Sequence, residues 1–214
     1  MLNVQKKFQR ANGNINVKIN NNEINRFYQS GSAKVFYPKS SQKIKELVLV
    51  NTAGGLTSGD NFFYNIDIIN KSKIFVTTQT AERVYKGINE NAEIKVTLLV
   101  DDTSDLFWIP QELILFNNCN LKRKIEVNLK SNSNFLLAES TIFGRTAMGE
   151  ILEKGFFEDN WKIYLNKKLI HAEALSLTGN IKDKLSSIAC TDNSVAICNI
   201  FVSGKHFLSK EDLL

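Results

Sequence analysis

The chain of 214 residues has few of the residues that build cross-links, metal cages or acid–base sites: two prolines, three cysteines and two histidines. Its cysteines are odd in number and widely spaced, which fits neither a disulfide framework nor a CxxC metal site. They are Cys119, Cys190 and Cys198. We expect all three thiols to be reduced and at least two of them to be buried. Without a cysteine–histidine cage, no tightly bound cofactor is expected.

Long apolar runs are also missing. The longest stretches, such as residues 47–50 and 113–116, are far shorter than the roughly 20 residues that cross a bilayer as a helix. The polar N-terminus shows neither an apolar core nor a small-residue cleavage site, which argues against a secretory signal. The sequence therefore predicts no membrane partner and a cytoplasmic location.

Basic residues exceed acidic ones by 27 to 22, which gives a net charge of +5 and a pI near 9.0. A nucleic-acid partner would require these charges to gather in a patch or stripe. They are instead spread along the chain, and the one short run, residues 122–124, lacks arginine-rich or aromatic surroundings. We interpret that run as a solvated strand edge and predict no nucleic-acid binding.

Short runs of alternating apolar and polar residues dominate the chain. Residues 15–19, 62–68 and 94–98 follow this period-two pattern, which is typical of half-buried strands. Further candidate strands cover residues 34–37, 46–51, 73–78, 105–109, 113–117, 122–129, 134–140, 161–165 and 168–174. The short connections leave no room for the helices that join parallel strands in βαβ units. We therefore predict a mainly β, antiparallel fold of coiled stacked sheets, either β-helix-like or a sandwich.

One or two helices are expected to accompany these strands. The strongest helical pattern covers residues 181–190, where three apolar residues share one face and Thr178 is a candidate N-cap. A short helical turn is expected within residues 146–152. The length of the chain fits a single domain, residues 1–214.

A glycine-rich loop follows the apolar strand at residues 46–51. Its sequence, NTAGGLTSGD at residues 51–60, lacks the GK[ST] ending of a P-loop, and the next segment alternates like a strand instead of starting a helix. Nucleotide binding is therefore not expected. Gly54, Gly55 and Gly59 can adopt positive φ angles and bring the backbone close to another chain or an ion. A tight β-connection is the structural alternative.

Two further segments concentrate polar side chains next to strands. Residues 77–86, TTQTAERVYK, combine hydroxyl groups, one carboxylate and two cations, although a polar strand with its turn explains the pattern equally well. Residues 108–116, WIPQELILF, place Glu112 between apolar neighbours. That carboxylate either faces solvent or is buried, and burial would require a partner such as Arg83 or Arg145.

A fourth segment, ESTIFGRTAMGE at residues 139–150, places two carboxylates around an arginine within an otherwise apolar and small-residue stretch. The structural interpretation is a salt bridge between Arg145 and either Glu139 or Glu150.

Catalytic groups are poorly represented in these segments. The two histidines, His171 and His206, lie far from them in sequence, and we expect a packing or surface role for His171. No serine occupies a G-x-S-x-G nucleophile elbow. Glu112 and Glu139 could form a glycosidase pair, but the aromatic sugar platforms expected beside them are not apparent. The sequence therefore favours a protein without catalytic activity.

Taken together and in this order, the four segments resemble the urease accessory protein family called UreD in most bacteria and UreH in others. The β-rich flanks are compatible with the same family from near residue 11 to about residue 180. The resemblance implies a non-catalytic scaffold with a helically coiled, largely β architecture and two helices. It also implies binding to apo-urease and to a UreF-type accessory protein, which recruits a UreG-type GTPase. The assembly would deliver Ni²⁺ to urease, with a water-filled tunnel as the route.

The resemblance also points to candidate site residues. A conduit must replace part of the hydration shell of an ion without holding the ion, so scattered oxygen donors suit it better than a closed cage. The expected transient Ni²⁺ ligands are Asp60, Glu112 and Glu139, which rank first, and Glu82 and Glu150. The expected neutral donors, counter-charges and loop-shaping residues are Thr77, Thr78, Gln79, Tyr85, Arg83, Arg145, Gly54, Gly55 and Gly59.

The chain departs from the family pattern at two points. Ser58 stands where many relatives have glycine, and family chains usually continue beyond a point like Leu214. The single UreD-like domain of residues 1–214 is therefore expected to be shortened at its C-terminus. Two alternative functions stay open: a passive chaperone of apo-urease that conducts no metal, and a carbohydrate-active β enzyme.

Overall fold

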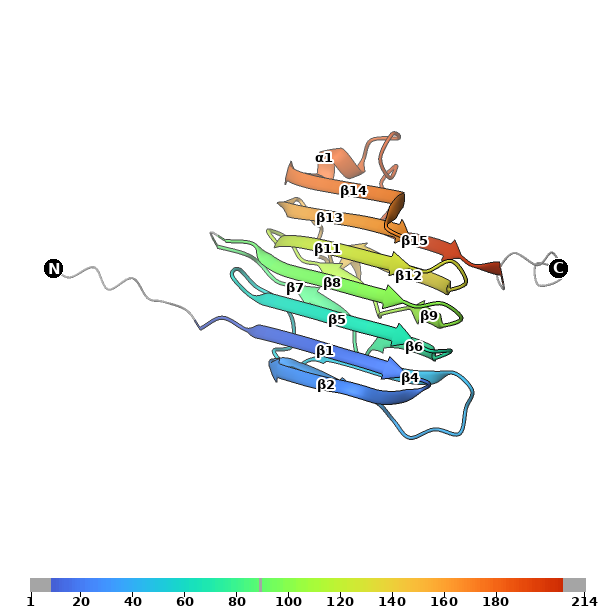
Figure 1. The fold of residues 1–214 in the computed structure, drawn as a ribbon. Coiled ribbons are helices and arrows are strands. Elements are labelled where there is room, and N and C mark those ends of the chain that lie inside the picture. Colours follow the sequence, from blue (N-terminus) through green and yellow to red (C-terminus); the bar gives the residue numbers. More distant parts are fainter. Residues whose placement is uncertain (1–8, 89, 206–214) are drawn as a thin grey trace.

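The computed structural model describes residues 9–88 and 90–205, which form two facing β-sheets around one core. The chain passes back and forth between the sheets as a β-solenoid of about 4 turns. Figure 1 shows the strands of the front sheet stacked from β2 (Glu23–Gly31) at the bottom to β14 (Lys168–Asn180) at the top. The prediction of a mainly β fold with coiled, β-helix-like sheets is confirmed.

Among the residues that the structure describes, the front sheet, sheet A, has seven strands. Besides β2 and β14 they are β1 (Asn12–Asn20), β5 (Asn61–Ile69), β8 (Ala92–Val100), β11 (Asn120–Leu129) and β13 (Lys154–Leu165). Their order in space is β14-β13-β11-β8-β5-β1-β2.

The second sheet, sheet B, is interrupted in its middle. Its strands are β3 (Ala33–Phe36), β4 (Lys45–Asn51), β6 (Lys73–Thr78), β7 (Glu82–Val84), β9 (Asp105–Trp108), β10 (Leu113–Leu115), β12 (Asn134–Phe143) and β15 (Ala196–Ser203). Their order is β3-β4-β6-β9-β12-β10-β7, and β15 also pairs with β12. The long strand β12 pairs with β9 near its start and with β10 near its end. The interruption therefore lies at residues 79–81 and 109–112.

Most strand pairs are parallel, so the prediction of an antiparallel fold is wrong. Nine of the thirteen pairings in the described part of the chain are parallel. In a solenoid the strand after β5 belongs to the opposite sheet, and the chain returns beside β5, as β8, only after a full turn. The opposite sheet thus provides the crossover that a helix provides in a βαβ unit. Short connections do not exclude parallel pairing.

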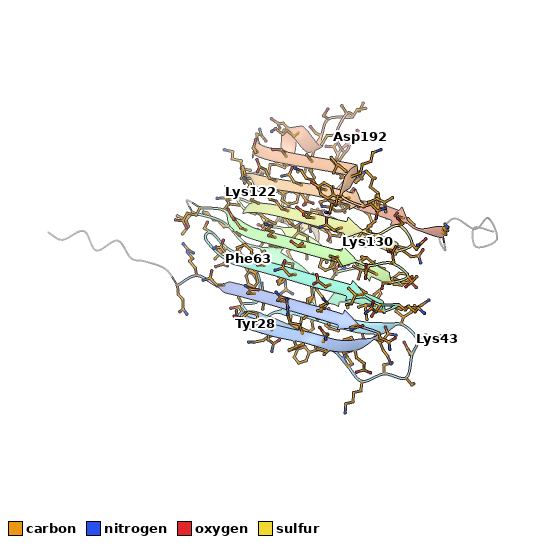
Figure 2. The ribbon with its side chains drawn as sticks, in the orientation of Figure 1. Tyr28, Lys43, Phe63, Lys122, Lys130 and Asp192 are labelled. Carbon is orange, nitrogen blue, oxygen red and sulfur yellow. The ribbon has the colours of Figure 1, made fainter. Side chains whose placement is uncertain are left out.

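The side chains that alternate along the strands fill the space between the sheets. Ile15, Val17 and Ile19 of β1 are fully buried. Burying a side chain of this size fully contributes about 1.5–3 kcal/mol of hydrophobic free energy. On the outside of sheet A, Tyr28 and Phe63 remain 51% and 40% exposed. Figure 2 labels both side chains on the front sheet. The period-two pattern of the sequence therefore separates core positions from surface positions.

Helix α1 (Ile181–Leu185) is shorter than predicted. Its N-cap is Asn180, not Thr178, and the Asn180 side chain accepts a hydrogen bond from the Asp183 amide at 3.4 Å. The helix does not continue to residue 190, because Ile188 is 87% exposed and finds no core surface to pack on. The predicted short helical turn is confirmed as a 3₁₀ helix, η1 (Thr146–Met148).

The burial of the cysteines was predicted wrongly. Cys119 is buried, but Cys190 lies in the exposed turns after α1 and Cys198 is exposed on β15. The sequence pattern also does not predict β2 or β15, which lie at sheet edges and expose much of their length. Within the ranges that the structure describes, no helix is long and apolar enough to span a bilayer.

Candidate functional site

The four motif segments of the sequence are neighbours in space. The loop at residues 51–60 pairs with the segment that contains β7, where Leu56 N donates to Arg83 O at 2.7 Å. Strand β7 pairs in parallel with β10, and β10 pairs in parallel with β12. Segments from four separate parts of the chain thus surround the interruption in sheet B.

A cavity lies at this interruption and extends between the two sheets. Its volume is about 70 Å³, which corresponds to roughly two water molecules at about 30 Å³ each. Residues 78–81 and 110–111 line it where sheet B is interrupted. The Thr78 hydroxyl joins the two sides of the interruption, because it accepts a hydrogen bond from Gln111 N and donates one to Thr80 O, both at 3.0 Å.

Four ionisable side chains line the cavity: Tyr64 and Arg123 from sheet A, and Glu82 and Glu139 from sheet B. Two of them, Glu82 and Glu139, belong to the motif segments. Burial raises the pKa of Tyr64, and the nearby Glu82 charge adds to the effect. Tyr64 therefore acts as a neutral hydroxyl group in this cavity.

Glu82 is held in place by Asn51. Asn51 Nδ2 donates to Glu82 Oε1 at 3.1 Å and to Oε2 at 3.2 Å, and it also lies 3.2 Å from Gly55 O. Burial raises the pKa of Glu82 to about 7, although the hydrogen bond from Asn51 opposes the shift. Near neutral pH this carboxyl group therefore occurs in both its charged and its neutral form.

Arg123, Glu139 and Asp159 form a buried charged cluster that joins the two sheets. Arg123 on β11 donates to Asp159 on β13, from Nε to Oδ1 at 2.9 Å and from Nη2 to Oδ2 at 2.5 Å. Its Nη1 lies 2.7 Å from Glu139 Oε2 on β12 in sheet B. Trp108 Nε1 donates to Glu139 Oε1 at 2.5 Å, and Trp161 Nε1 donates to Asp159 Oδ2 at 3.1 Å. The three charged residues are only 5–7% exposed.

The charges in this cluster stabilise one another. Burial raises the pKa of the Glu139 carboxyl above its ordinary value, and the charge of Arg123 offsets only part of this rise. Burial alone would lower the pKa of Arg123, but Asp159 and Glu139 hold it above its ordinary value. Glu139 Oε2 contacts Arg123 Nη1 as an ion pair without an aligned hydrogen bond. This oxygen is fully buried, and the pair with Arg123 is its contact.

The position of Arg123 corrects the interpretation of residues 122–124 as a solvated strand edge. Strand β11 is central in sheet A. Arg123 points toward the core, as do the buried apolar residues two positions before and after it. Only Lys122 and Lys124 face outward. The alternating pattern could have predicted the burial of Arg123, because it places this arginine at an inward position, where its charge needs partners. Asp159, which takes an inward position of β13, could have been found in the same way.

Arg145 lies at the rim of the site, which consists of Arg145, Glu150, Phe116, Tyr85 and Gly54, and not in the interior of the site. Its Nε donates to Glu150 Oε2, so the predicted salt bridge is confirmed. The guanidinium group lies 4.1 Å from the centre of the Phe116 ring, and Phe116 packs edge-on against Tyr85 at 5.0 Å between ring centres. Tyr85 OH donates to Gly54 O at 3.1 Å. These rim contacts connect the fourth motif segment to the glycine-rich loop.

Asp60 holds the glycine-rich loop together. Its side chain is buried, with Oδ1 accepting from Ala11 N and Oδ2 accepting from Thr57 N, both at 2.8 Å. Asp60 is not among the residues that line the cavity. Backbone amides therefore satisfy both carboxylate oxygens, and the conduit role of Asp60 stays a prediction.

Glu112 lines a second cavity, together with Thr77 and Glu46. Residues 110–111 border both cavities, so the two are adjacent. In the described ranges no salt bridge joins Glu112 to either arginine that the sequence suggested as its partner. Glu112 and Glu139 thus line different cavities, whereas a glycosidase pair must converge in one open cleft.

A closed metal cage is not part of this arrangement. Across residues 9–88 and 90–205, no group of three or more His, Cys, Asp or Glu side chains is placed to hold a metal ion. His171 packs on Phe201 at 5.1 Å between ring centres and lies 3.7 Å from Glu173, which confirms its packing or surface role. His206 lies outside the described residues. The site can therefore offer single oxygen ligands to a hydrated cation but cannot enclose it.

The fold and the site define a class of protein: a β-solenoid scaffold with a small, charged interior cavity. Comparison with known proteins identifies the family within this class. The model of the UreD urease accessory protein family matches residues 10–213. Urease accessory protein UreD of Rhizobium leguminosarum bv. viciae is 38% identical over 181 residues, which cover 85% of this chain and 66% of that protein. The chain therefore belongs to the UreD urease accessory protein family.

Two further UreD proteins are similar to most of the chain. UreD of Rhodopseudomonas palustris strain BisB5 is 38% identical over 172 residues, which cover 80% of this chain and 61% of the relative. UreD 1 of Brucella anthropi is 34% identical over 218 residues, which cover 96% of this chain and 77% of the relative. The chain spans 61–66% of the length of the Rhizobium and Rhodopseudomonas proteins. The resemblance carried by the four motifs is confirmed, and the family is one of non-catalytic accessory proteins, not of carbohydrate-active enzymes.

Proposed function

We propose that the chain is a urease maturation factor, a non-catalytic scaffold that binds apo-urease and helps deliver Ni²⁺ to the urease active site. It acts in the cytoplasm as a single domain. Its direct partners are apo-urease and a UreF-type accessory protein, and a UreG-type GTPase joins indirectly. Ni²⁺ is the cargo of the scaffold, held transiently, and not a resident cofactor.

The observation that carries this proposal is the convergence of the four motif segments on one cavity with carboxylates in its wall. Glu82 and Glu139 come from segments far apart in sequence, yet both line the space between the sheets. Burying a carboxylate costs free energy unless it has partners. Glu139 has Arg123 as a cationic partner, but in the described ranges no salt bridge joins Glu82 to a cation, so Glu82 in particular favours a ligand of positive charge.

The geometry suits a weakly held cation. Asn51 engages both oxygens of Glu82, and Trp108 and Arg123 engage Glu139. Each carboxylate can therefore give the ion one ligand but cannot surround it, so the ion is held only weakly. The hydroxyl of Thr78 lies at the same cavity as a neutral donor.

The remaining candidate residues take supporting places in the proposed route. Glu112 and Thr77 line the adjacent outer cavity, where a cation could enter or leave. Glu150 is engaged by Arg145 and by Asn117 N at 3.0 Å, so it orders the rim.

Urease activation in cells that express all urease genes tests the proposal. The charge-neutral variants Glu82→Gln and Glu139→Gln should lower urease activity and nickel content without loss of the complex with urease. Glu93→Gln is the matched control, because Glu93 lies at an exposed position of β8 and makes the same charge change outside the cavity. A pull-down with the tagged chain should recover urease subunits or the UreF-type protein, and recovery of neither would refute the proposal.

The same experiment separates conduction from passive support. If both cavity variants bind urease and activate it as well as the control does, the protein is a passive chaperone that holds apo-urease in an open conformation and conducts no metal. Loss of activation in the cavity variants alone, with the complex intact, supports passage of the ion through this subunit.

A further inference from the structure

One arginine at the wall of the cavity lies between two buried carboxylates: Glu139, which also lines the cavity, and Asp159, which does not. All three nitrogen atoms of the Arg123 guanidinium group are engaged: Nε and Nη2 by Asp159, and Nη1 by Glu139. The carboxylates belong to different sheets, so the guanidinium group is the link between them. It therefore occupies the position that a cation bound by both carboxylates would need.

The charge of Arg123 determines how strongly this position attracts a divalent cation. With both carboxylates ionised, Glu139 and Asp159 carry two negative charges, and Arg123 compensates one of them. Among the residues that line the cavity, no other side chain is cationic. Charges interact more strongly where water is excluded, and two carboxylates are the kind of ligand set that binds divalent cations. Without the arginine, the pair would hold such a cation far more tightly than Glu139 does alone.

We propose that Arg123 is a built-in counter-ion that prevents the Glu139–Asp159 pair from trapping the divalent cation that passes through the cavity. It donates to both oxygens of Asp159 and pairs with Oε2 of Glu139 at 2.7 Å. The two carboxylates therefore engage the guanidinium group instead of forming a two-carboxylate trap for the ion. The inference rests on the proposed function for the identity of the cargo, and it adds a positioning residue from outside the four motif segments.

Arginine suits this role better than lysine. The guanidinium group stays protonated at every physiological pH, and its planar shape allows it to bind one carboxylate through two nitrogens while the third reaches another group. A lysine would keep the charge, but its single nitrogen could not bind Asp159 through a two-nitrogen fork and also reach Glu139. The two indole N–H groups hold the carboxylates in place around the arginine.

Metal binding by the purified full chain tests the inference. Arg123→Met removes the charge with little change of shape, and Lys124→Met is the matched control, because Lys124 is the next residue of β11 and faces outward. Equilibrium dialysis with Ni²⁺ alone at neutral pH should show that the Arg123→Met variant gains one site, bound on the order of tenfold more tightly than by the wild type. The control should bind like the wild type, and Arg123→Met/Glu139→Gln should lose the gain.

Binding by the Arg123→Met variant no tighter than by the control would overturn the inference. If Arg123→Met folds only when Ni²⁺ is added, the added ion replaces the missing charge, which supports the inference. If it does not fold in either condition, Arg123→Gln takes its place, because the amide can still donate hydrogen bonds to the two carboxylates but carries no charge. Tighter Ni²⁺ binding by that variant supports the inference, and unchanged binding overturns it. The readout needs no urease, so its failure is distinguishable from failure of the proposed function.

Discussion

Two arginine–glutamate pairs in this protein share their chemistry but not their surroundings. The side chains of Arg123 and Glu139 are 9% and 4% exposed, whereas those of Arg145 and Glu150 are 41% and 23% exposed. The buried pair is completed by a second carboxylate and two indole groups. The rim pair is partly hydrated and stacks on an aromatic ring.

The comparison shows that position in the fold, not residue type, determines the consequence of losing a partner. Buried charges have given up their hydration, so each depends on the others for its stability. Charges at the rim can return to water when a partner is removed. The interior cluster should therefore be sensitive to substitution, while the rim pair should tolerate it.

The largest expected effect comes from removing one partner of the buried cluster. Arg123→Met should lower the free energy of unfolding by about 3–5 kcal/mol, because it leaves two buried carboxylates without a counter-charge. Arg145→Met should cost about 0–1 kcal/mol, as exposed pairs do. Urea unfolding without divalent cations measures both values. Equal losses of unfolding free energy in the two variants would show that burial does not determine how much each ion pair contributes to stability.

A smaller effect should follow from the pH dependence of Glu82. The folded-state pKa is about 7, above the ordinary value of 4.5, so the folded protein binds the proton more tightly than the unfolded chain does. The associated stability is fully present below about pH 4.5 and is lost as the pH rises through 7. At about 1.4 kcal/mol per pKa unit, the loss is at most about 3.5 kcal/mol.

Urea unfolding at pH 5 and pH 8 checks this prediction. Relative to the wild type, Glu82→Gln should lose less stability between these two pH values, because the amide does not ionise. Glu93→Gln, which changes an exposed carboxylate, should follow the wild-type pH dependence. Parallel curves for the wild type and Glu82→Gln would show that the Glu82 carboxyl titrates in the folded state as it does in the unfolded chain.

Much of the fold could be predicted from the sequence, because inward and outward positions alternate along most strands. The pattern located strands such as β1, β5 and β8 correctly. It could not distinguish parallel from antiparallel pairing, since both give the same alternation and the partner depends on how the whole chain winds. Edge strands such as β2 were missed because they are exposed along most of their length, so their composition does not alternate.

The candidate site was predictable only in part. The motif segments include Glu82 and Glu139, which line the cavity, and Arg145 and Glu150, which pair at the rim. Arg123 lies outside the motifs, and its buried role depends on strands that are distant in sequence. Single-residue alternation shows that such a side chain points inward, but it does not show which carboxylates meet it.

The smallest expected effect concerns the loop at the rim. Gly54 and Gly55 both have positive φ angles, of 78° and 145°, but their surroundings differ. A Cβ atom on Gly55 would clash with the Tyr85 ring and lie 2.7 Å from Arg83 O, whereas one on Gly54 would meet nothing within 4 Å. Gly55→Ala should therefore cost about 2–3 kcal/mol of unfolding free energy, and Gly54→Ala only about 1 kcal/mol.

Urea unfolding of the two alanine variants separates close packing from backbone strain. Both variants place a side chain at a positive φ angle, so the difference between them reports the contact of the loop with Tyr85. Combining Gly55→Ala with Tyr85→Ala should recover part of the loss, because the ring that the new Cβ meets is then gone. Equal costs for the two glycines would mean that the rim is loosely packed. The tolerance of the Arg145–Glu150 pair to substitution would then reflect disorder of the loop and not hydration of the charges.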